Sequence, residues 1–263
     1  MKRQSDRPRP VPSETYSTDY FLGECEGYSD FAKGRVSPRL ERALGYVDAG
    51  PGRRILDLGC GRGEATAWAA RKGALVCGAD YAAHALRIAQ ERCNTTDGEG
   101  LILLVRADAC ALPFADGAFE RVMMLDIVEH LYPWQLERTF TEVYRVLSTG
   151  GLLVVHTAPN LWYYRFGYPL FRIVQALRGI RLPRNPRARY RYHERVHVNE
   201  QSPTSLWRGL RRVHFGVRVW VDDSRLDTSA LGGFLQRVVR LGLRIAPIRW
   251  VLASDVFAIA IKS

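Results

Sequence analysis

Residues 55–66 read Ile-Leu-Asp-Leu-Gly-Cys-Gly-Arg-Gly-Glu-Ala-Thr. Ile55–Leu58 is a short apolar run typical of a buried strand, three glycines follow at once, and Glu64–Arg71 has the composition of a helix. A strand, a glycine turn and a helix in this order form the ligand-binding corner of an open parallel sheet. Glycines let the backbone approach a ligand, and the helix N-terminus offers unpaired N–H groups. The stretch therefore predicts a ligand at the glycine turn.

Two aspartates indicate which ligand the turn takes. Asp80 ends the next apolar run, about 20 residues beyond the glycines, where a carboxylate suits the two hydroxyls of a ribose. Asp57 would repel a pyrophosphate and can accept from an ammonium group. The glycines run G-x-G-x-G, so neither the dinucleotide fingerprint nor a P-loop is present. A ligand with a ribose, an ammonium group and a carboxylate but no phosphate is S-adenosylmethionine (SAM); the alternative is a turn that serves packing alone.

The following segment adds motifs that resemble a known family. Leu101–Val105 reads as a third strand, residues 111–120 read Ala-Leu-Pro-Phe-Ala-Asp-Gly-Ala-Phe-Glu, and Arg121–Asp126 reads as a fourth strand before Ile-Val-Glu-His-Leu. With the glycine turn, these motifs resemble the class I SAM-dependent methyltransferases with a methyltransferase type 11 domain. The branch is that of quinone-biosynthesis and small-molecule methyltransferases. The resemblance is close over residues 50–160, although Glu120 stands where the family usually has Asp.

The resemblance implies a fold and a set of cofactor contacts. The fold is a doubly wound, Rossmann-like α/β sheet of seven strands in the order 3-2-1-4-5-7-6, with strand 7 antiparallel and an insertion after strand 5. In the family, an acid at the Asp108 position meets the adenine amino group, and the Asp126–His130 segment passes near the sulfonium. The expected SAM contacts are Asp57, Gly59, Cys60, Gly61, Gly63, Asp80, Tyr81, Asp108, Ala109, Leu125, Asp126 and His130.

The remaining chain predicts one domain with two flanking features. At 263 residues, a single α/β domain with an insertion can bury a full core. Residues 1–12 are basic and proline-rich without an apolar signal region, which predicts a disordered arm. Residues 13–263 form the methyltransferase domain, with 13–45 as an N-terminal lid and 160–213 as an insertion at the acceptor site. An odd number of cysteines, five, without a C-x-x-C pair predicts reduced thiols, no metal site and a cytoplasmic location.

The insertion carries the charge excess of the chain. Residues 161–220 hold thirteen arginines, no lysine and two acids, and the chain has a net charge of +11. Three interpretations compete: an anionic small or lipid-linked acceptor paired with arginine forks, an RNA partner, or a solvated basic surface. Ser202-Pro203 resembles an N-cap and first helical residue, which predicts a helix over Pro203–Arg212. Leu231–Ile245 has the spacing of a basic amphipathic helix, which either contacts a membrane surface peripherally or packs on the sheet.

Methyl transfer from a sulfonium asks mainly for alignment of the acceptor, and a base helps when the acceptor loses a proton. His130 follows the fourth strand and His156 ends the fifth, so these two are the catalytic candidates, with His193 and His197 in the insertion as others. The sequence thus predicts SAM-dependent methylation, at oxygen, of a small-molecule or lipid- or glycan-linked acceptor. The alternatives are an RNA methyltransferase and a SAM-binding regulatory protein without catalysis.

Overall fold

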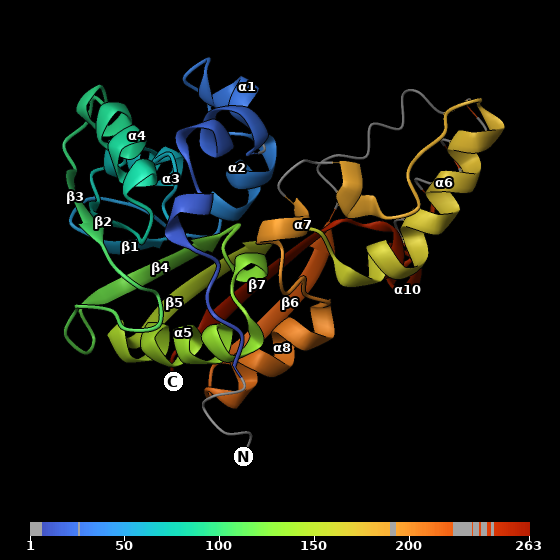
Figure 1. Ribbon diagram of the computed structural model, residues 1–263. Coiled ribbons are helices and arrows are strands. Elements are labelled where there is room, and N and C mark those ends of the chain that lie inside the picture. Colours follow the sequence, from blue (N-terminus) through green and yellow to red (C-terminus); the bar gives the residue numbers. More distant parts are fainter. Residues whose placement is uncertain are drawn as a thin grey trace.

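A seven-stranded sheet organises the molecule (Figure 1). The computed structural model describes residues 7–25, 27–189, 193–222, 233, 237, 241–242 and 245–263. The strand order is β3-β2-β1-β4-β5-β7-β6, and β7 runs antiparallel to both of its neighbours, which confirms the prediction. The strands are β1 (Arg54–Leu58), β2 (Leu75–Asp80), β3 (Leu101–Arg106), β4 (Phe119–Leu125), β5 (Leu147–Thr157), β6 (Gly216–Asp222) and β7 (Asp255–Ile261).

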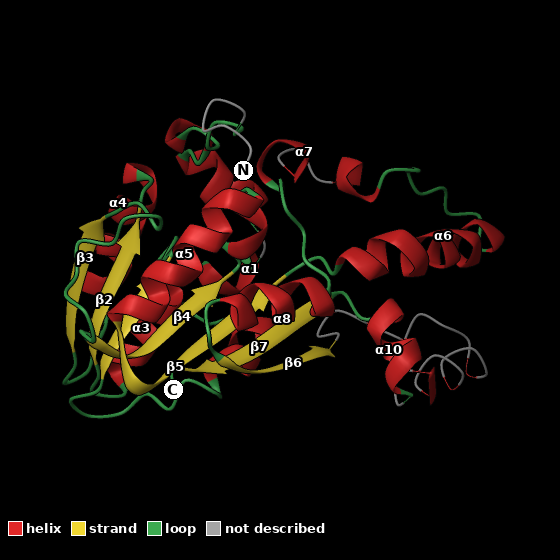
Figure 2. Cartoon of the chain, turned by 90° about the horizontal axis from the view of Figure 1, so that it is seen from below, coloured by secondary structure: helices red, strands yellow, loops and turns green. Residues whose placement is uncertain are grey.

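Helices cover both faces of the sheet (Figures 1 and 2). One face carries α2 (Pro38–Leu44), α3 (Glu64–Arg71) and α4 (Ala83–Asn94). The other carries α5 (Pro133–Val146) and α8 (Pro203–Arg212). The start of α8 is the predicted one, because the Ser202 side chain accepts from the backbone N–H of Ser205 at 3.1 Å.

The core has a layer on each side of the sheet. On β1, Ile55 packs into the cluster under α2 and α3, whereas Leu56 and Leu58 belong to the cluster under α5 and α8. Met123 and Met124 of β4 divide in the same way. Because both faces are buried, the central parallel strands contain short apolar runs instead of alternating apolar and polar residues. The short apolar runs of the sequence therefore mark the central strands.

The N-terminal segment packs against the domain. It contains the short helices η2 (Ser13–Thr15), η3 (Tyr20–Glu24) and α1 (Tyr28–Phe31). Residues 1–6 lie outside the described part of the chain, but residues 7–12 are not the free arm that the sequence predicted. Val11 is buried, and the carbonyl of Pro8 accepts from Trp134 Nε1 at 3.1 Å. Proline and arginine content suggested disorder there, whereas one buried valine and a backbone contact hold the segment on α5.

The insertion after β5 projects from the domain and then returns to it. It comprises η5 (Tyr163–Gly167), α6 (Tyr168–Leu177), η6 (Pro186–Arg189) and α7 (His193–Val196), and α6 points away from the sheet (Figures 1 and 2). α10 (Ala246–Leu252) precedes β7. The predicted helix over Leu231–Ile245 falls almost wholly outside the described residues. Among the described residues, no helix is long and apolar enough to cross a membrane.

Candidate functional site

A pocket opens where the central parallel strands end. β1, β2 and β4 end at Leu58, Asp80 and Leu125, and the parallel register brings these ends to one edge of the sheet. The N-terminal segment closes the pocket from the other side. The predicted SAM contacts in the pocket wall are Asp57, Gly59, Cys60, Gly61, Asp80, Tyr81, Asp108, Ala109, Leu125, Asp126 and His130.

Two glycines of the turn have backbone conformations and close neighbours that leave no room for a side chain. Gly59 has φ +75°, and a Cβ there would lie 2.7 Å from Ile127 Cδ1. Gly63 departs from the prediction, because it does not line the pocket. It precedes α3 with φ +76°, and a Cβ would lie 3.0 Å from Ala89 Cβ on α4. Gly63 therefore serves the close packing of α3 on α4 rather than contact with a cofactor.

Asp80 and Asp57 provide the acidic wall of the pocket. Asp80 Oδ2 accepts from the backbone N–H of Gly61 at 3.0 Å, and Oδ1 accepts from Ala82 at 2.9 Å. These bonds hold its carboxylate against the glycine turn. Burial raises the pKa of Asp80. Asp57 accepts from Thr66 Oγ1 at 2.6 Å, and burial, with a smaller contribution from the Asp80 charge, raises the pKa of Asp57 to about 6. Asp57 is therefore ionised at neutral pH and available to a cation.

Asp126 belongs to a buried ionic chain behind the pocket. It has φ +59°, its Oδ2 lies 2.6 Å from Arg39 Nη2, and its Oδ1 lies 2.6 Å from His156 Nδ1. Asp255 Oδ1 lies 3.8 Å from the other imidazole nitrogen of His156. Both oxygens of Asp126 are thus engaged by cations. Its carboxylate shapes the wall of the pocket and is already neutralised by Arg39 and His156.

His156 does not fill the catalytic role that the sequence predicted. Its side chain is fully buried and is not part of the pocket wall. Burial by itself lowers the pKa of His156, but the carboxylates of Asp126 and Asp255 outweigh it and raise the pKa to about 9. An imidazolium cannot accept a proton. At the C-terminal end of β5 this side chain points into the protein, between Asp126 and Asp255. The sequence alone did not indicate this direction.

The N-terminal segment forms a wall of aromatic side chains over the pocket. Tyr16, Tyr20 and Phe21 are buried and line it. Arg62, the residue between two glycines of the turn, fastens this segment: Nη1 donates to the carbonyls of Phe21 at 3.0 Å and Cys25 at 3.3 Å. These contacts support the predicted lid.

Two arginines of the site were missed by sequence reasoning. Arg62 is buried and pairs with Glu64 at 2.8 Å, and Arg39 is buried on α2 at the pocket wall. Arg62 stands at a position that the G-x-G-x-G pattern leaves open, so its place inside the motif was the only signal. Arg39 lies before the first strand in a segment without any motif. Its exposure to the pocket depends on how α2 packs.

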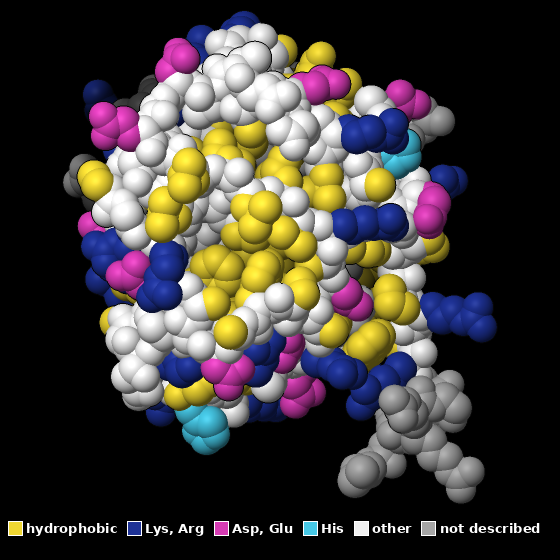
Figure 3. Space-filling model, turned by 90° about the vertical axis from the view of Figure 1, so that its left-hand side faces the viewer, with side chains coloured by type: hydrophobic (Ala, Val, Ile, Leu, Met, Phe, Trp, Pro, Cys, Tyr) yellow, Lys and Arg dark blue, Asp and Glu magenta, His cyan; other side chains and the backbone are white. Residues whose placement is uncertain are grey.

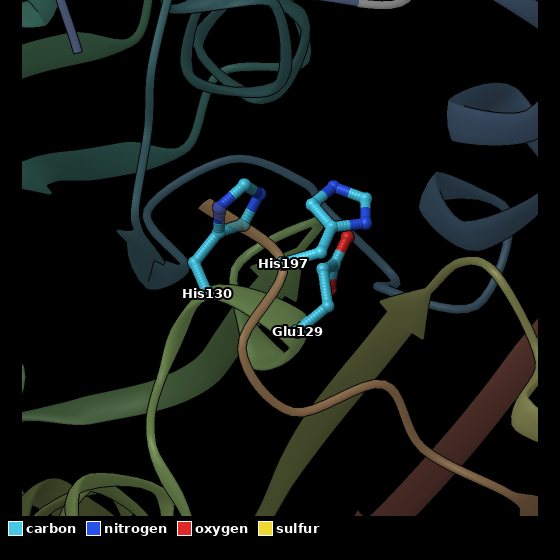
Figure 4. Close-up of side chains that lie close together, drawn as sticks. All are labelled: Glu129, His130 and His197. Atoms are coloured by element: carbon cyan, nitrogen blue, oxygen red, sulfur yellow. The ribbon is translucent and has the colours of Figure 1, made fainter. Parts of the chain in front are cut away.

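His130 lies in the pocket wall beside a second histidine. It follows β4 at the end of η4 (Val128–His130), and its Nδ1 lies 3.2 Å from the hydroxyl of Tyr16. The ring of His197, from the returning insertion, lies edge-to-face with it at a centroid distance of 4.9 Å. Figure 4 shows both imidazoles above η4, with the Glu129 side chain reaching toward His197. The backbone N–H groups of residues 198 and 199 donate to the carbonyl of Glu129. These bonds hold the returning part of the insertion beside η4.

Glu129, His130 and His197 also form a group with metal-ligand chemistry, although the sequence predicted no metal. Each offers one ligand atom, and these atoms lie within 4.8 Å of one another. Burial, and then the charge of Asp126, raises the pKa of Glu129 to about 8. Its Oε2 accepts from Thr157 Oγ1 at 2.7 Å. A raised pKa favours the protonated carboxyl, and a proton competes with an ion for the same oxygens.

The arginines of the insertion fall into two groups. Arg187 pairs with the buried carboxylate of Glu200 through its Nε at 2.6 Å, so it stabilises the insertion. Arg165, Arg178, Arg181 and Arg184 are exposed. The side chains of Arg189 and Arg191, and the side chain of the candidate His193, lie outside the described part.

The pocket fits SAM by its donor set. Gly59 and Gly61 of the turn line it, Asp80 suits a ribose, and Asp57 suits an ammonium group. Residues 56–155 match the model of a family described as "Methyltransferase domain". This stretch forms a class I SAM-dependent methyltransferase domain. Its cofactor is SAM.

Two curated relatives each match somewhat less than half of the chain. Methyltransferase GfsG of Streptomyces halstedii is 36% identical over 116 residues, which are 44% of this chain and 41% of that protein. Demethylmenaquinone methyltransferase of Thermus thermophilus is 38% identical over 109 residues, 41% of this chain and 48% of that protein. The chain thus spans less than half the length of each of these relatives.

Solved structures share the fold over most of the chain. Geranyl diphosphate methyltransferase in complex with SAM has a TM-score of 0.59 at 19% identity and covers 94% of this chain and 96% of its own. Phosphoethanolamine N-methyltransferase 2 of Haemonchus contortus, also in complex with SAM, has a TM-score of 0.58 at 16% identity and covers 95% of this chain and 56% of its own. At these identities the likeness extends to the fold alone.

Proposed function

We propose that the protein transfers the methyl group of SAM to a hydroxyl of a small or lipid-linked, anionic acceptor. The observation that carries this proposal is one pocket whose wall contains the glycine turn, Asp57, Asp80 and Asp108 on one side and His130 on the other. SAM supplies an electrophilic methyl group when bound. The work left to the chain is to hold both partners in line, exclude water and remove a proton.

Each part of the pocket has a separate task. Asp80 binds the ribose hydroxyls, Asp108 the adenine amino group and Asp57 the ammonium group. The aromatic wall of Tyr16 and Tyr20 excludes water, because both side chains are buried at the pocket. His130 accepts the acceptor's proton while the Tyr16 hydroxyl, at 3.2 Å from Nδ1, fixes the orientation of the ring.

The exposed arginines support an anionic acceptor. They lie on the insertion whose returning segment places His197 beside His130, so the positive field and the pocket share one structural unit. A field of one sign draws oppositely charged substrates toward such a site. Methylation at carbon is the second candidate, because relatives include demethylmenaquinone methyltransferase and botryococcene C-methyltransferase.

A labelling experiment tests the proposal. The protein is incubated with a cell extract and SAM carrying a ¹³C methyl group, and products are compared by mass with a reaction containing His130→Ala. The chemical shift of the labelled methyl distinguishes oxygen from carbon as the site of transfer. Formation of S-adenosylhomocysteine with a labelled, anionic O-methyl product supports the proposal. SAM binding without turnover would make the protein a non-catalytic binder, and labelled RNA would identify an RNA methyltransferase.

A further inference from the structure

α6 and the turn before it expose a stripe of apolar side chains. The stripe consists of Phe166, Leu170, Ile173 and Leu177. Their spacing of four, three and four residues places them on one side of a helix. They are between 54% and 84% exposed. Residues in this register normally face a core, so an exposed stripe marks a surface for a partner.

The sequence that carries the stripe has charges of a single sign. Residues 161–193 contain eight arginines, no lysine and no acidic residue. Arg165, Arg178 and Arg181 are exposed next to the stripe, and the guanidinium of Arg165 lies 5.6 Å from the ring centroid of Phe166. The complement of this surface is both apolar and anionic. A bilayer interface that contains anionic lipids has these two properties together.

The position of α6 suits such a surface. The helix extends away from the sheet, beyond the edge at which β5 ends (Figures 1 and 2). The edge strand β3 offers a contrast: Leu101 and Leu103 are 68% and 60% exposed. On the face that contains this edge, hydrophobic side chains gather in the middle, but charges of both signs surround them (Figure 3). Only the α6 stripe combines apolar exposure with one sign of charge among these two surfaces.

We infer that α6 docks the protein on an anionic membrane surface. The apolar stripe enters the interface and the arginines lie among the lipid headgroups, so the helix lies along the membrane and does not cross it. Delivery of a lipid-held acceptor to the pocket would follow from this docking and rests on the proposed function. The docking itself does not depend on catalysis.

Vesicle sedimentation with the full chain tests the inference. Vesicles of phosphatidylcholine alone are compared with vesicles that also contain phosphatidylglycerol. The test variant is Ile173→Ser with Leu177→Ser, and the matched control is Leu101→Ser with Leu103→Ser, which removes two exposed aliphatic side chains from β3. We expect binding to anionic vesicles, weak binding to neutral ones, and a loss of about ten-fold or more in the α6 variant alone.

Several results would overturn the inference. Absence of binding to anionic vesicles, an equal loss in both variants, or equal binding to both vesicle types would each exclude docking through α6. A dimer in solution that the α6 variant dissociates would place a second copy of the chain on the stripe instead. SAM affinity, measured by calorimetry in parallel, should be unchanged in both variants. This readout shows that they are folded and separates failure of the docking from failure of the proposed function.

Discussion

The pocket and the insertion hold their charged side chains in different ways. In the pocket, Asp80 accepts two backbone N–H groups and Asp126 lies between Arg39 and His156. In the insertion, most arginines of the described part are exposed, and Arg187 is tied to Glu200. Buried, hydrogen-bonded charges fix a geometry, whereas exposed charges attract a partner over a distance and are screened by salt. The pocket is therefore suited to recognise one specific ligand, and the insertion is suited to attract anionic ligands as a class.

The largest expected effect concerns proton removal in the pocket. His130→Ala should lower kcat by about 10²–10⁴-fold and leave SAM affinity nearly unchanged, because the imidazole acts on the acceptor. Tyr16→Phe, which removes only the hydroxyl at 3.2 Å from the ring, should cause a smaller loss. The control is His84→Ala, since His84 is outside the pocket wall. Near-normal turnover of His130→Ala in a steady-state assay would mean that the enzyme works by positioning alone.

The next effect concerns the ionic chain around His156, which we expect to stabilise the fold and not to act in catalysis. His156→Ala leaves Asp126 and Asp255 without their shared imidazolium, and removing one member of a buried ion pair costs about 3–5 kcal/mol. Urea denaturation should show this loss. Because the folded-state pKa of His156 is about 9, above its usual value near 6.5, its stabilisation is complete below pH 6.5 and disappears as pH rises through 9.

One result would contradict the structural role of His156. A variant with an unchanged urea midpoint and a collapsed kcat would restore His156 as a catalytic residue. A matched comparison is Asp255→Asn, which removes the second carboxylate and should lower the pH at which the stabilisation is lost. If that pH does not shift, Asp255 is not a source of the raised pKa of His156.

The smallest of these effects concerns the exposed arginines. Changing Arg165, Arg178, Arg181 and Arg184 to Gln should raise the KM of a water-soluble anionic acceptor by roughly three- to ten-fold at low salt, because exposed charges contribute little each. The difference should vanish at high salt, where the Debye length falls to about 3 Å. The control variant carries Arg87→Gln and Arg138→Gln, two exposed arginines on α4 and α5. Equal KM values for both variants would mean that the arginines of the insertion form a solvated basic surface and do not attract the acceptor.

The sequence predicted the two regions unequally. The start of α8 followed from a local pattern, because a serine before a proline marks a helix N-terminus. The strand order and the expected cofactor contacts followed from the family resemblance, and eleven of the twelve expected contacts lie in the pocket wall. The burial of His156 outside the pocket wall and the packing of Gly63 on α4 were not predicted, since the direction of a strand-end side chain and the packing of α3 on α4 are tertiary properties. Arg39 was missed for the same reason.

The insertion was predicted by its charge and not by its shape. Arginine content indicated a basic surface, but the pairing of Arg187 with Glu200 requires two segments to meet. The exposed stripe of α6 has the spacing of an ordinary core-facing helix, so only its position in the fold shows that it faces solvent. His197 came beside His130 because the chain returns over η4.

SAM binding to the wild type and to Asp80→Ala, measured by titration calorimetry, tests the central claim most directly. Charge-assisted hydrogen bonds contribute about 1.5–3 kcal/mol, so the variant should bind SAM about ten-fold more weakly or worse. The Asp80 carboxylate also accepts from Gly61 and Ala82, so circular dichroism must show that the variant is folded. The wild type should bind SAM saturably, and the variant should show a clear loss of affinity. A folded Asp80→Ala with the affinity of the wild type, or a wild type that does not bind SAM, would contradict it.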